Sequence, residues 1–223
     1  MAMDALTAMT TDDAILTLTQ WLSPAYPVGA FAYSHGLEAL VDDGRVKTAD
    51  DLRAWLEDVL RCGTGLCDAR LLAAAWKAQS AEAVASVDET ARALAASRER
   101  VLETDQLGAA FGKVTDDIWQ HEANALCYPV ALGRAASLQN IPLDLTLRLF
   151  LQATVSNLVS AGQRLAPIGQ TEAQRLVRDL MPLCHEIAET AKDGDLSNLS
   201  SFAFMADIAS MRHETQYSRI FRT

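Results

Sequence analysis

The stretch LDLTLRLFLQATVSNLV, residues 143–159, is the most apolar part of the chain and decides its fold. Charged and amide side chains interrupt it at Asp144, Arg148, Gln152 and Asn157. These interruptions exclude a membrane span, which needs about 20 predominantly apolar residues. A segment that is apolar on nearly every face predicts instead a helix buried on nearly all sides.

Helical patterns continue on both sides of this segment. Residues Thr48 to Asp51 match a capping box loosely, with an aspartate where glutamate is usual, and predict the start of a helix. Behind them, apolar residues recur at the spacing of one helix face: Leu52, Trp55, Leu56, Val59 and Leu60.

The alanine-rich residues 81–111 predict one or two further helices, with Leu94, Val101 and Leu102 facing inward. No segment alternates as a strand does, and the chain contains neither an internal repeat nor a domain linker. We therefore predict an all-α fold, a single-domain helical bundle of about ten helices.

Length and charge limit the possible functions. The 223 residues fit one large domain or two small ones, and the formal net charge is −10. This acidic balance argues against a nucleic-acid or anionic-membrane surface and is compatible with basic protein partners. We expect neither nucleic acid nor membrane among the partners.

The cysteine and histidine residues offer little chemistry. The four cysteines form no CxxC pair, and residues 1–16 lack the basic and apolar regions of a signal peptide. Both observations favour a cytoplasmic protein with reduced thiols. Because no cysteine or histidine spacing matches a structural zinc site, we expect no catalytic residue, no cofactor and no metal-ligand set in this chain.

Residues 23–38, SPAYPVGAFAYSHGLE, are the least helical segment of the first half. Their prolines and glycines predict a break, with a new helix starting near Ser34. Ser34, His35 and Glu38 then lie close together at a helix start. They could be catalytic in a small-molecule hydrolase with a pocket around His35 and Glu38, but a polar helix face that is exposed or contacts a partner is the favoured interpretation.

The last residues, 211–223, read MRHETQYSRIFRT and differ from the rest of the acidic chain. They carry three arginines against one glutamate, with Tyr217, Ile220 and Phe221 interleaved. We therefore divide the chain into a helical domain, residues 1–210, and a basic partner-binding tail. Apolar groups flanked by arginine are typical of a binding anchor, whereas a frayed terminus is the alternative.

Arg164 lies near the end of the most buried helix. An arginine there needs a carboxylate or carbonyl partner, either within the fold or at a protein interface. An arginine finger for a GTPase is a less favoured alternative.

The segment LSPAYPVGAFAYSHGLEALVDDGRV, residues 22–46, resembles the opening of the urease accessory protein UreF family, where SPALPVGGFSYSQGLE is close to the usual form. The resemblance continues in order through five further blocks, at residues 63–73, 103–104, 128–132, 157–170 and 207–219. These blocks span nearly the whole chain, and the last one is particularly specific.

The resemblance implies an all-α, non-catalytic chaperone of urease maturation. Such a protein is expected to bind the accessory protein UreD/UreH, to form a homodimer, and to recruit the GTPase UreG so that nickel is delivered to apo-urease. Nickel binding then belongs to the assembly, and this chain need not hold the metal. A regulatory role, activating or gating the UreG GTPase, is the alternative within the family.

The resemblance also implies partner-binding residues in the opening motif and in the tail: Tyr33, Ser34, His35, Glu38, Arg212, His213, Glu214, Tyr217 and Arg219. The tail is expected to become ordered on binding UreD/UreH and to help form the surface that docks UreG. Arg219 is expected to fix the tail by hydrogen bonds, because its guanidinium can satisfy several acceptors at once.

Overall fold

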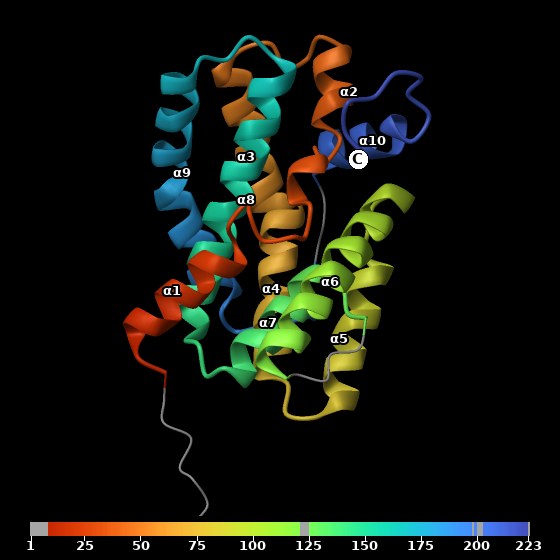
Figure 1. Cartoon of the computed structure of the whole chain (residues 1–223). Coiled ribbons are helices and arrows are strands. Elements are labelled where there is room, and N and C mark those ends of the chain that lie inside the picture. The colour runs from red at the N-terminus through yellow and green to blue at the C-terminus, as the bar shows by residue number, and fades with distance from the viewer. Residues whose placement is uncertain (1–8, 121–124, 198, 200–202, 223) are drawn as a thin grey trace, which may run out of the picture.

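The computed structural model describes residues 9–120, 125–197, 199 and 203–222, and these residues form an all-α bundle (Figure 1). Its elements are α1 (Thr11–Trp21), the 3-10 helix η1 (Ala30–Ala32), α2 (Leu37–Asp42), α3 (Ala49–Cys62), α4 (Thr64–Lys77), α5 (Ala81–Ala93), α6 (Arg98–Trp119), α7 (Tyr128–Leu138), α8 (Leu143–Leu165), α9 (Gln170–Ala191) and α10 (Phe204–His213). The predicted all-α class and the predicted number of helices are both confirmed.

Helix α8 runs through the middle of the bundle and packs against α1, α2, α3, α4, α7 and α9. Within residues 143–159 only Asp144 is exposed, and every other residue is buried or half-buried. The predicted burial of this segment is therefore confirmed. In the part of the chain that the structure describes, no helix combines the length and the apolar character needed to cross a bilayer.

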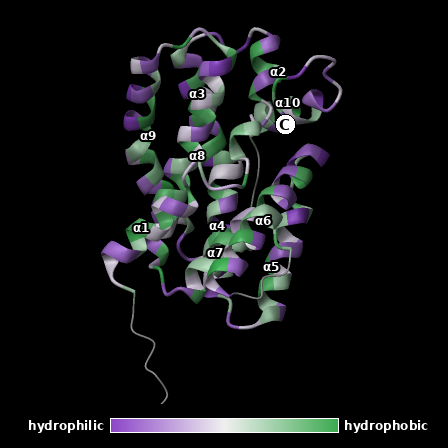
Figure 2. Ribbon diagram, in the orientation of Figure 1, coloured by the Kyte–Doolittle hydropathy of each residue, from purple (hydrophilic) through white to green (hydrophobic). Residues whose placement is uncertain are grey.

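The helices pack through faces that the sequence marks as apolar, and apolar and polar residues alternate around each helix (Figure 2). In α3 the predicted capping box is present: the Asp51 amide donates to Thr48 Oγ1 over 3.2 Å, and the Thr48 amide donates to Asp51 Oδ2 over 3.0 Å. The predicted stripe behind the cap is buried. Helix α7 can lie close to α4 because Gly133 has no side chain. A Cβ at this position would stand only 2.3 Å from the Leu72 carbonyl oxygen.

The predicted helix start near Ser34 is wrong. Helix α2 begins at Leu37, because His35 (φ 55°) and Gly36 (φ 79°) both adopt the left-handed conformation and cannot continue a right-handed helix. Ser34 and Glu38 are also buried, so of the two alternatives for this polar face, exposure is wrong for these two side chains.

The predicted inward face of α6 is wrong at Leu102, which is 52% exposed. The buried residues at the start of this helix are instead Glu99, Arg100 and Glu103. Charged side chains are buried at such positions when ion pairs compensate them. Here the partners come from three distant parts of the chain: the opening segment, α4 and the C-terminal residues.

Candidate functional site

The C-terminal residues fold back onto the body of the protein. Helix α10 packs against α2 and α6 at one end of the bundle (Figure 1). The tail predicted from residue 211 begins within the last turn of α10 and continues from this helix across the opening segment. Near its end, the Arg222 amide donates to the Ala32 carbonyl over 2.8 Å. Residues that were expected to act in two separate motifs therefore lie side by side.

Glu38 is the main acceptor for the tail. Its Oε1 accepts from the Ile220 amide over 2.7 Å, and its Oε2 accepts from the Phe221 amide over 2.8 Å. The same Oε2 lies 3.2 Å from His213 Nε2. One buried carboxylate on α2 therefore holds both α10 and the tail.

Glu99 on α6 completes this group from the other side. Its Oε2 lies 2.8 Å from His213 Nδ1, and its Oε1 accepts from the Arg219 guanidinium over 2.7 Å. We name Glu38, Glu99, His213 and Arg219 the carboxylate clasp. The His213 side chain is fully buried within it, while Arg219 is 40% exposed.

The neighbouring contacts depend on a close approach of α10. A Cβ at Gly36 would lie only 2.5 Å from the Ser210 amide nitrogen, so only glycine leaves room for α10 here. This approach brings Ser210 Oγ within 2.6 Å of Ser97 Oγ. One turn later, Glu214 Oε1 accepts from the Arg98 amide over 2.8 Å.

Phe221 anchors the end of the tail in the core, where it is buried. The Arg164 guanidinium lies 4.2 Å from the centre of the Phe221 ring and donates to the Phe31 carbonyl over 2.8 Å. The carbonyl partner expected for Arg164 is therefore present. The arginine links α8, the opening segment and the tail.

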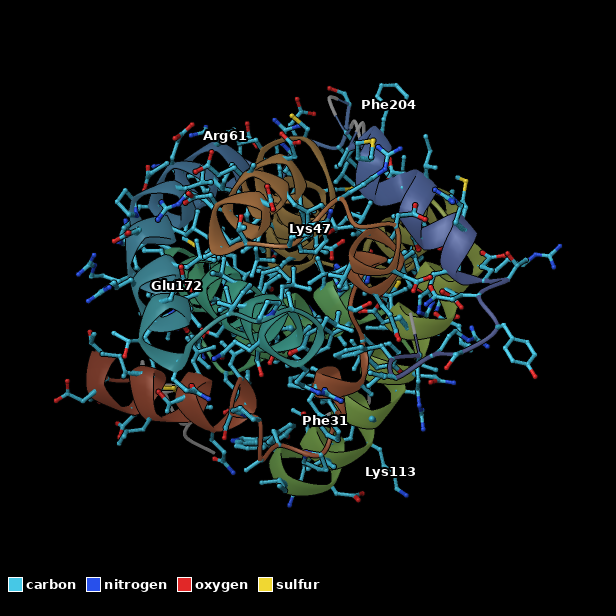
Figure 3. All side chains as sticks on the ribbon, turned by 90° about the horizontal axis from the view of Figure 1, so that it is seen from above. Phe31, Lys47, Arg61, Lys113, Glu172 and Phe204 are labelled. Carbon is cyan, nitrogen blue, oxygen red and sulfur yellow. The ribbon has the colours of Figure 1, made fainter. Side chains whose placement is uncertain are left out.

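The outer side of the tail is apolar and arginine-rich. Tyr217 is fully exposed, and Ile220 is 64% exposed. Phe31 is also exposed and lies at the periphery, as does Phe204 at the start of α10 (Figure 3). Arg212 faces outward and forms a pair with Asp43 at 2.5 Å.

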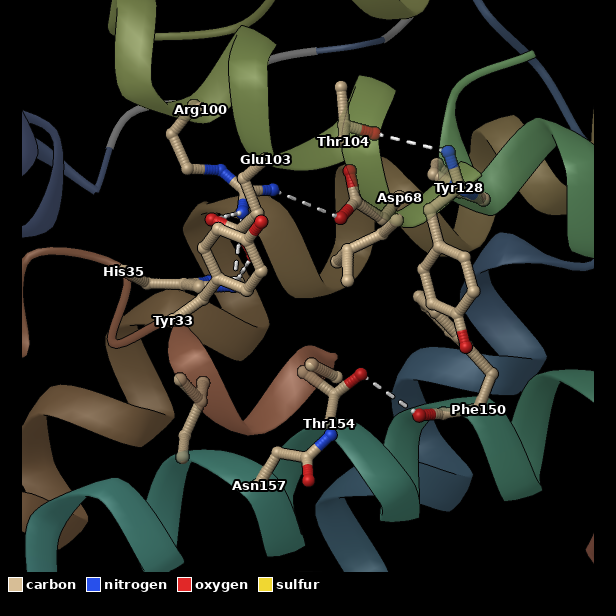
Figure 4. Close-up of a pocket in the computed structure, with 14 residues that line it drawn as sticks. Tyr33, His35, Asp68, Arg100, Glu103, Thr104, Tyr128, Phe150, Thr154 and Asn157 are labelled. Carbon is tan, nitrogen blue, oxygen red and sulfur yellow. Dashed lines mark hydrogen bonds and ion pairs between the residues drawn. The ribbon is translucent and has the colours of Figure 1, made fainter. Parts of the chain in front are cut away.

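A second charged cluster lies behind the opening motif (Figure 4). His35 Nε2 is 2.8 Å from Glu103 Oε1, and Arg100 donates to Glu103 Oε2 over 2.6 Å. Arg100 also lies 3.5 Å from Asp68. Burial disfavours the ionised Glu103 carboxylate, but Arg100 and His35 outweigh this effect and hold its pKa at about 2. For Asp68 burial prevails and raises the pKa.

This cluster lines a cavity of about 60 Å³, together with Tyr33, whose hydroxyl donates to Gln106 Oε1 over 2.8 Å. A space of that size holds only a few water molecules, which is too little for an organic substrate. Glu38 does not line it, because its carboxylate is directed to the tail. The structure thus does not bring His35 and Glu38 into one pocket, as the hydrolase alternative requires.

Metal-binding groups do not gather at this site. Within the described ranges, no three or more histidine, cysteine, aspartate or glutamate side chains are grouped so that they could hold an ion. The four cysteines are free thiols, and Cys62 is the exposed one.

The comparisons with known proteins agree with the motifs. The UreF family profile matches residues 46–181. The urease accessory protein UreF of Ruegeria pomeroyi is 51% identical over 216 residues, which cover 97% of this chain and all of that protein. The chain belongs to the UreF family of urease accessory proteins. The UreF protein of Roseobacter denitrificans is 52% identical over 211 residues, covering 95% of each chain.

Several residues of this UreF-family site were not predicted from sequence. Glu99 and Arg100 were assigned no role, and Asp68 and Glu103 were included only as members of matching blocks. One signal was available: Glu99 and Glu103 fall four residues apart, in register with the buried Leu107 and Phe111 on one face of α6.

Proposed function

We propose that this chain is a non-catalytic factor of urease maturation. In this proposal it binds UreD/UreH, forms a homodimer, and recruits the GTPase UreG in the cytoplasm so that nickel reaches apo-urease. Membership of the UreF family supports the role in urease maturation. The geometry of the tail supports the role as a scaffold.

The observation that carries the proposal is the two-sided character of the tail. One side is fixed to the body through Glu38 and Glu99, while Tyr217 and Ile220 point away from it. Aromatic and aliphatic side chains flanked by arginine are enriched among interface residues that contribute most of the binding energy. Because the tail is already held in one shape, less conformational entropy is lost when a partner binds.

The buried residues of the opening motif take an indirect part in this proposal. Tyr33, Ser34, His35 and Glu38 are buried or half-buried beneath the tail, so a partner does not need to touch them. They contribute to binding by holding the tail and the surrounding helices in place. Arg212, Glu214, Tyr217 and Arg219 have partly or fully exposed surfaces and are assigned direct contact.

The test is size-exclusion chromatography of the full chain mixed with UreD/UreH and UreG from the same organism. Tyr217→Ala removes an exposed ring without internal contacts in the described structure, so the variant should fold normally and fail to form the three-protein complex. Arg219→Ala should fold and lose UreG recruitment. Arg178→Ala, a largely exposed arginine on α9, is the matched control and should assemble fully. Normal assembly of both tail variants would refute a tail-centred scaffold.

Regulation of the UreG GTPase is the second candidate. The structure weakens the case for Arg164 as an arginine finger, because its guanidinium already contacts the Phe31 carbonyl and the Phe221 ring. Arg222 is the other candidate: it is exposed near the end of the tail, and its guanidinium makes one long contact, 3.4 Å, to Gln106 Oε1. GTP hydrolysis by UreG, measured with the unaltered chain and with Arg222→Ala, separates activation from recruitment: activation predicts a slower rate with the variant at equal complex formation.

A further inference from the structure

The carboxylate clasp has an unusual proton count. Both ring nitrogens of His213 face carboxylate oxygens, at 2.8 Å for Glu99 and 3.2 Å for Glu38. Each of these two contacts needs a proton between nitrogen and oxygen. A neutral imidazole has one N–H, so with two ionised carboxylates one contact would place a nitrogen lone pair against an oxygen lone pair.

Satisfying both contacts requires one proton more than a neutral imidazole and two carboxylates provide. The remaining contacts of the two carboxylates indicate which group holds it. The other oxygen of Glu38 accepts from the Ile220 amide, and the other oxygen of Glu99 accepts from Arg219. The second oxygen of each carboxylate thus already accepts an N–H and is not a donor in these contacts. With a doubly protonated imidazole, the two positive and two negative groups of the clasp balance, whereas a neutral imidazole leaves one buried negative charge without compensation.

We infer that docking of the C-terminal tail takes up one proton, which His213 holds between Glu38 and Glu99. His213 is the last residue of α10, at the start of the tail. Undocking that frees this last turn together with the tail exposes the imidazole to water, and a solvated imidazole is mostly neutral above about pH 7. The docked tail is therefore favoured at lower pH and released progressively as the pH rises. This inference concerns the chain by itself and does not depend on the proposed partners.

Few other charges bear on this site. The charged groups that face His213 are Glu38 on α2, Glu99 on α6 and Arg219 in the tail. The nearby charges at the rim are exposed or half-buried. Glu214 accepts from the backbone amide of Arg98, and Arg212 pairs with Asp43.

The first test uses the full chain and measures the hydrogen exchange of the Ile220 and Phe221 amides, which both donate to Glu38. After correction for the intrinsic pH dependence of exchange, their protection should fall by up to tenfold per pH unit between pH 7 and pH 8.5, the slope of a one-proton linkage. Protection that does not change with pH would overturn the inference.

Two variants sharpen this test. Glu99→Gln supplies an amide that can donate to an unprotonated ring nitrogen, so a neutral imidazole satisfies the clasp and the slope should disappear. Glu214→Gln is the matched control, because Glu214 is a tail carboxylate that does not touch His213, and it should keep the full slope. An unchanged slope in Glu99→Gln would contradict the assignment.

A second measurement does not depend on any variant remaining docked. Nitrogen NMR of the chain labelled in its histidines should show both His213 ring nitrogens protonated at pH 7.5, with the signal identified by its loss in His213→Gln. A neutral-tautomer spectrum in a chain whose tail amides are protected would refute the proposal outright.

Discussion

Replacing Gly36 by alanine should displace α10 from the body of the protein. Gly36 has φ 79°, and the added methyl group would lie 2.5 Å from the Ser210 amide nitrogen and 2.9 Å from the Ala209 carbonyl carbon. Both neighbours are backbone atoms of α10, which cannot rotate out of the way as a side chain can. The helix has to move as a whole.

Two costs add in this variant. A non-glycine residue in the left-handed conformation costs about 1–2 kcal/mol. Forcing a methyl group into a filled contact costs a further amount of about 1–3 kcal/mol. The free energy of unfolding should therefore fall by about 2–5 kcal/mol, and any shift of α10 also moves His213 within the clasp.

The chain contains a matched control in Gly29. It has nearly the same backbone conformation, φ 80°, but nothing lies within 4 Å of the position that a Cβ would occupy. Gly29→Ala should therefore show the conformational cost alone, about 1–2 kcal/mol. Urea unfolding followed by circular dichroism measures both variants, and hydrogen exchange at Ile220 reports whether the tail stays docked.

The difference between the two alanine variants isolates the steric contact. We expect Gly36→Ala to be less stable than Gly29→Ala by about 1–3 kcal/mol and to lose protection at Ile220. Equal stability of the two, with tail protection intact in both, would show that α10 does not depend on this close approach.

Three further predictions concern other parts of the structure. Glu103→Gln should lower the free energy of unfolding at pH 7 by about 3–5 kcal/mol, since it leaves Arg100 without its closest partner. Because the pKa of Glu103 is about 2, below its ordinary 4.5, its stabilisation is complete above pH 4.5 and is lost as the pH falls towards 2. The free energy of unfolding should therefore fall less steeply between pH 4.5 and pH 2 in the variant than in the unaltered chain. The same pH dependence in both would contradict the ion-pair assignment. Arg164→Ala should speed exchange at the Phe221 amide severalfold, since a cation–π contact contributes about 0.5–2 kcal/mol; an unaltered rate would exclude this anchor. Among the four thiols, Cys62 alone should react quickly with a thiol reagent at pH 7.5, and rapid labelling of a second thiol would count against the burial of the others.

Features set by short-range patterns could be predicted from the sequence. The capping box at Thr48 and Asp51 involves residues three apart, and the stripe behind it follows from helical periodicity. The burial of residues 143–159 follows from composition alone. In each case the residues that decide the structure are neighbours in the chain.

The charged face of α6 could not be predicted in this way. Periodicity favoured Leu102 as an inward residue, because a charged side chain is assigned to solvent unless its partner is known. The partners of Arg100 and Glu103 include His35, which lies 65 and 68 positions away. Likewise, the tail could be recognised as basic and aromatic, but its attachment to Glu38 depends on tertiary contacts that composition does not encode.

The attachment of the tail to Glu38 also sets an order of events during synthesis. Glu38 leaves the ribosome early, whereas the amides of Ile220 and Phe221 follow 182 and 183 positions later. Chains fold from the N-terminal side as they emerge, and contacts between such distant residues form late. The end of the bundle that carries α2 therefore stays incomplete until Ile220 and Phe221 have emerged, and a chain interrupted before them is left with an unsatisfied carboxylate where the tail would dock.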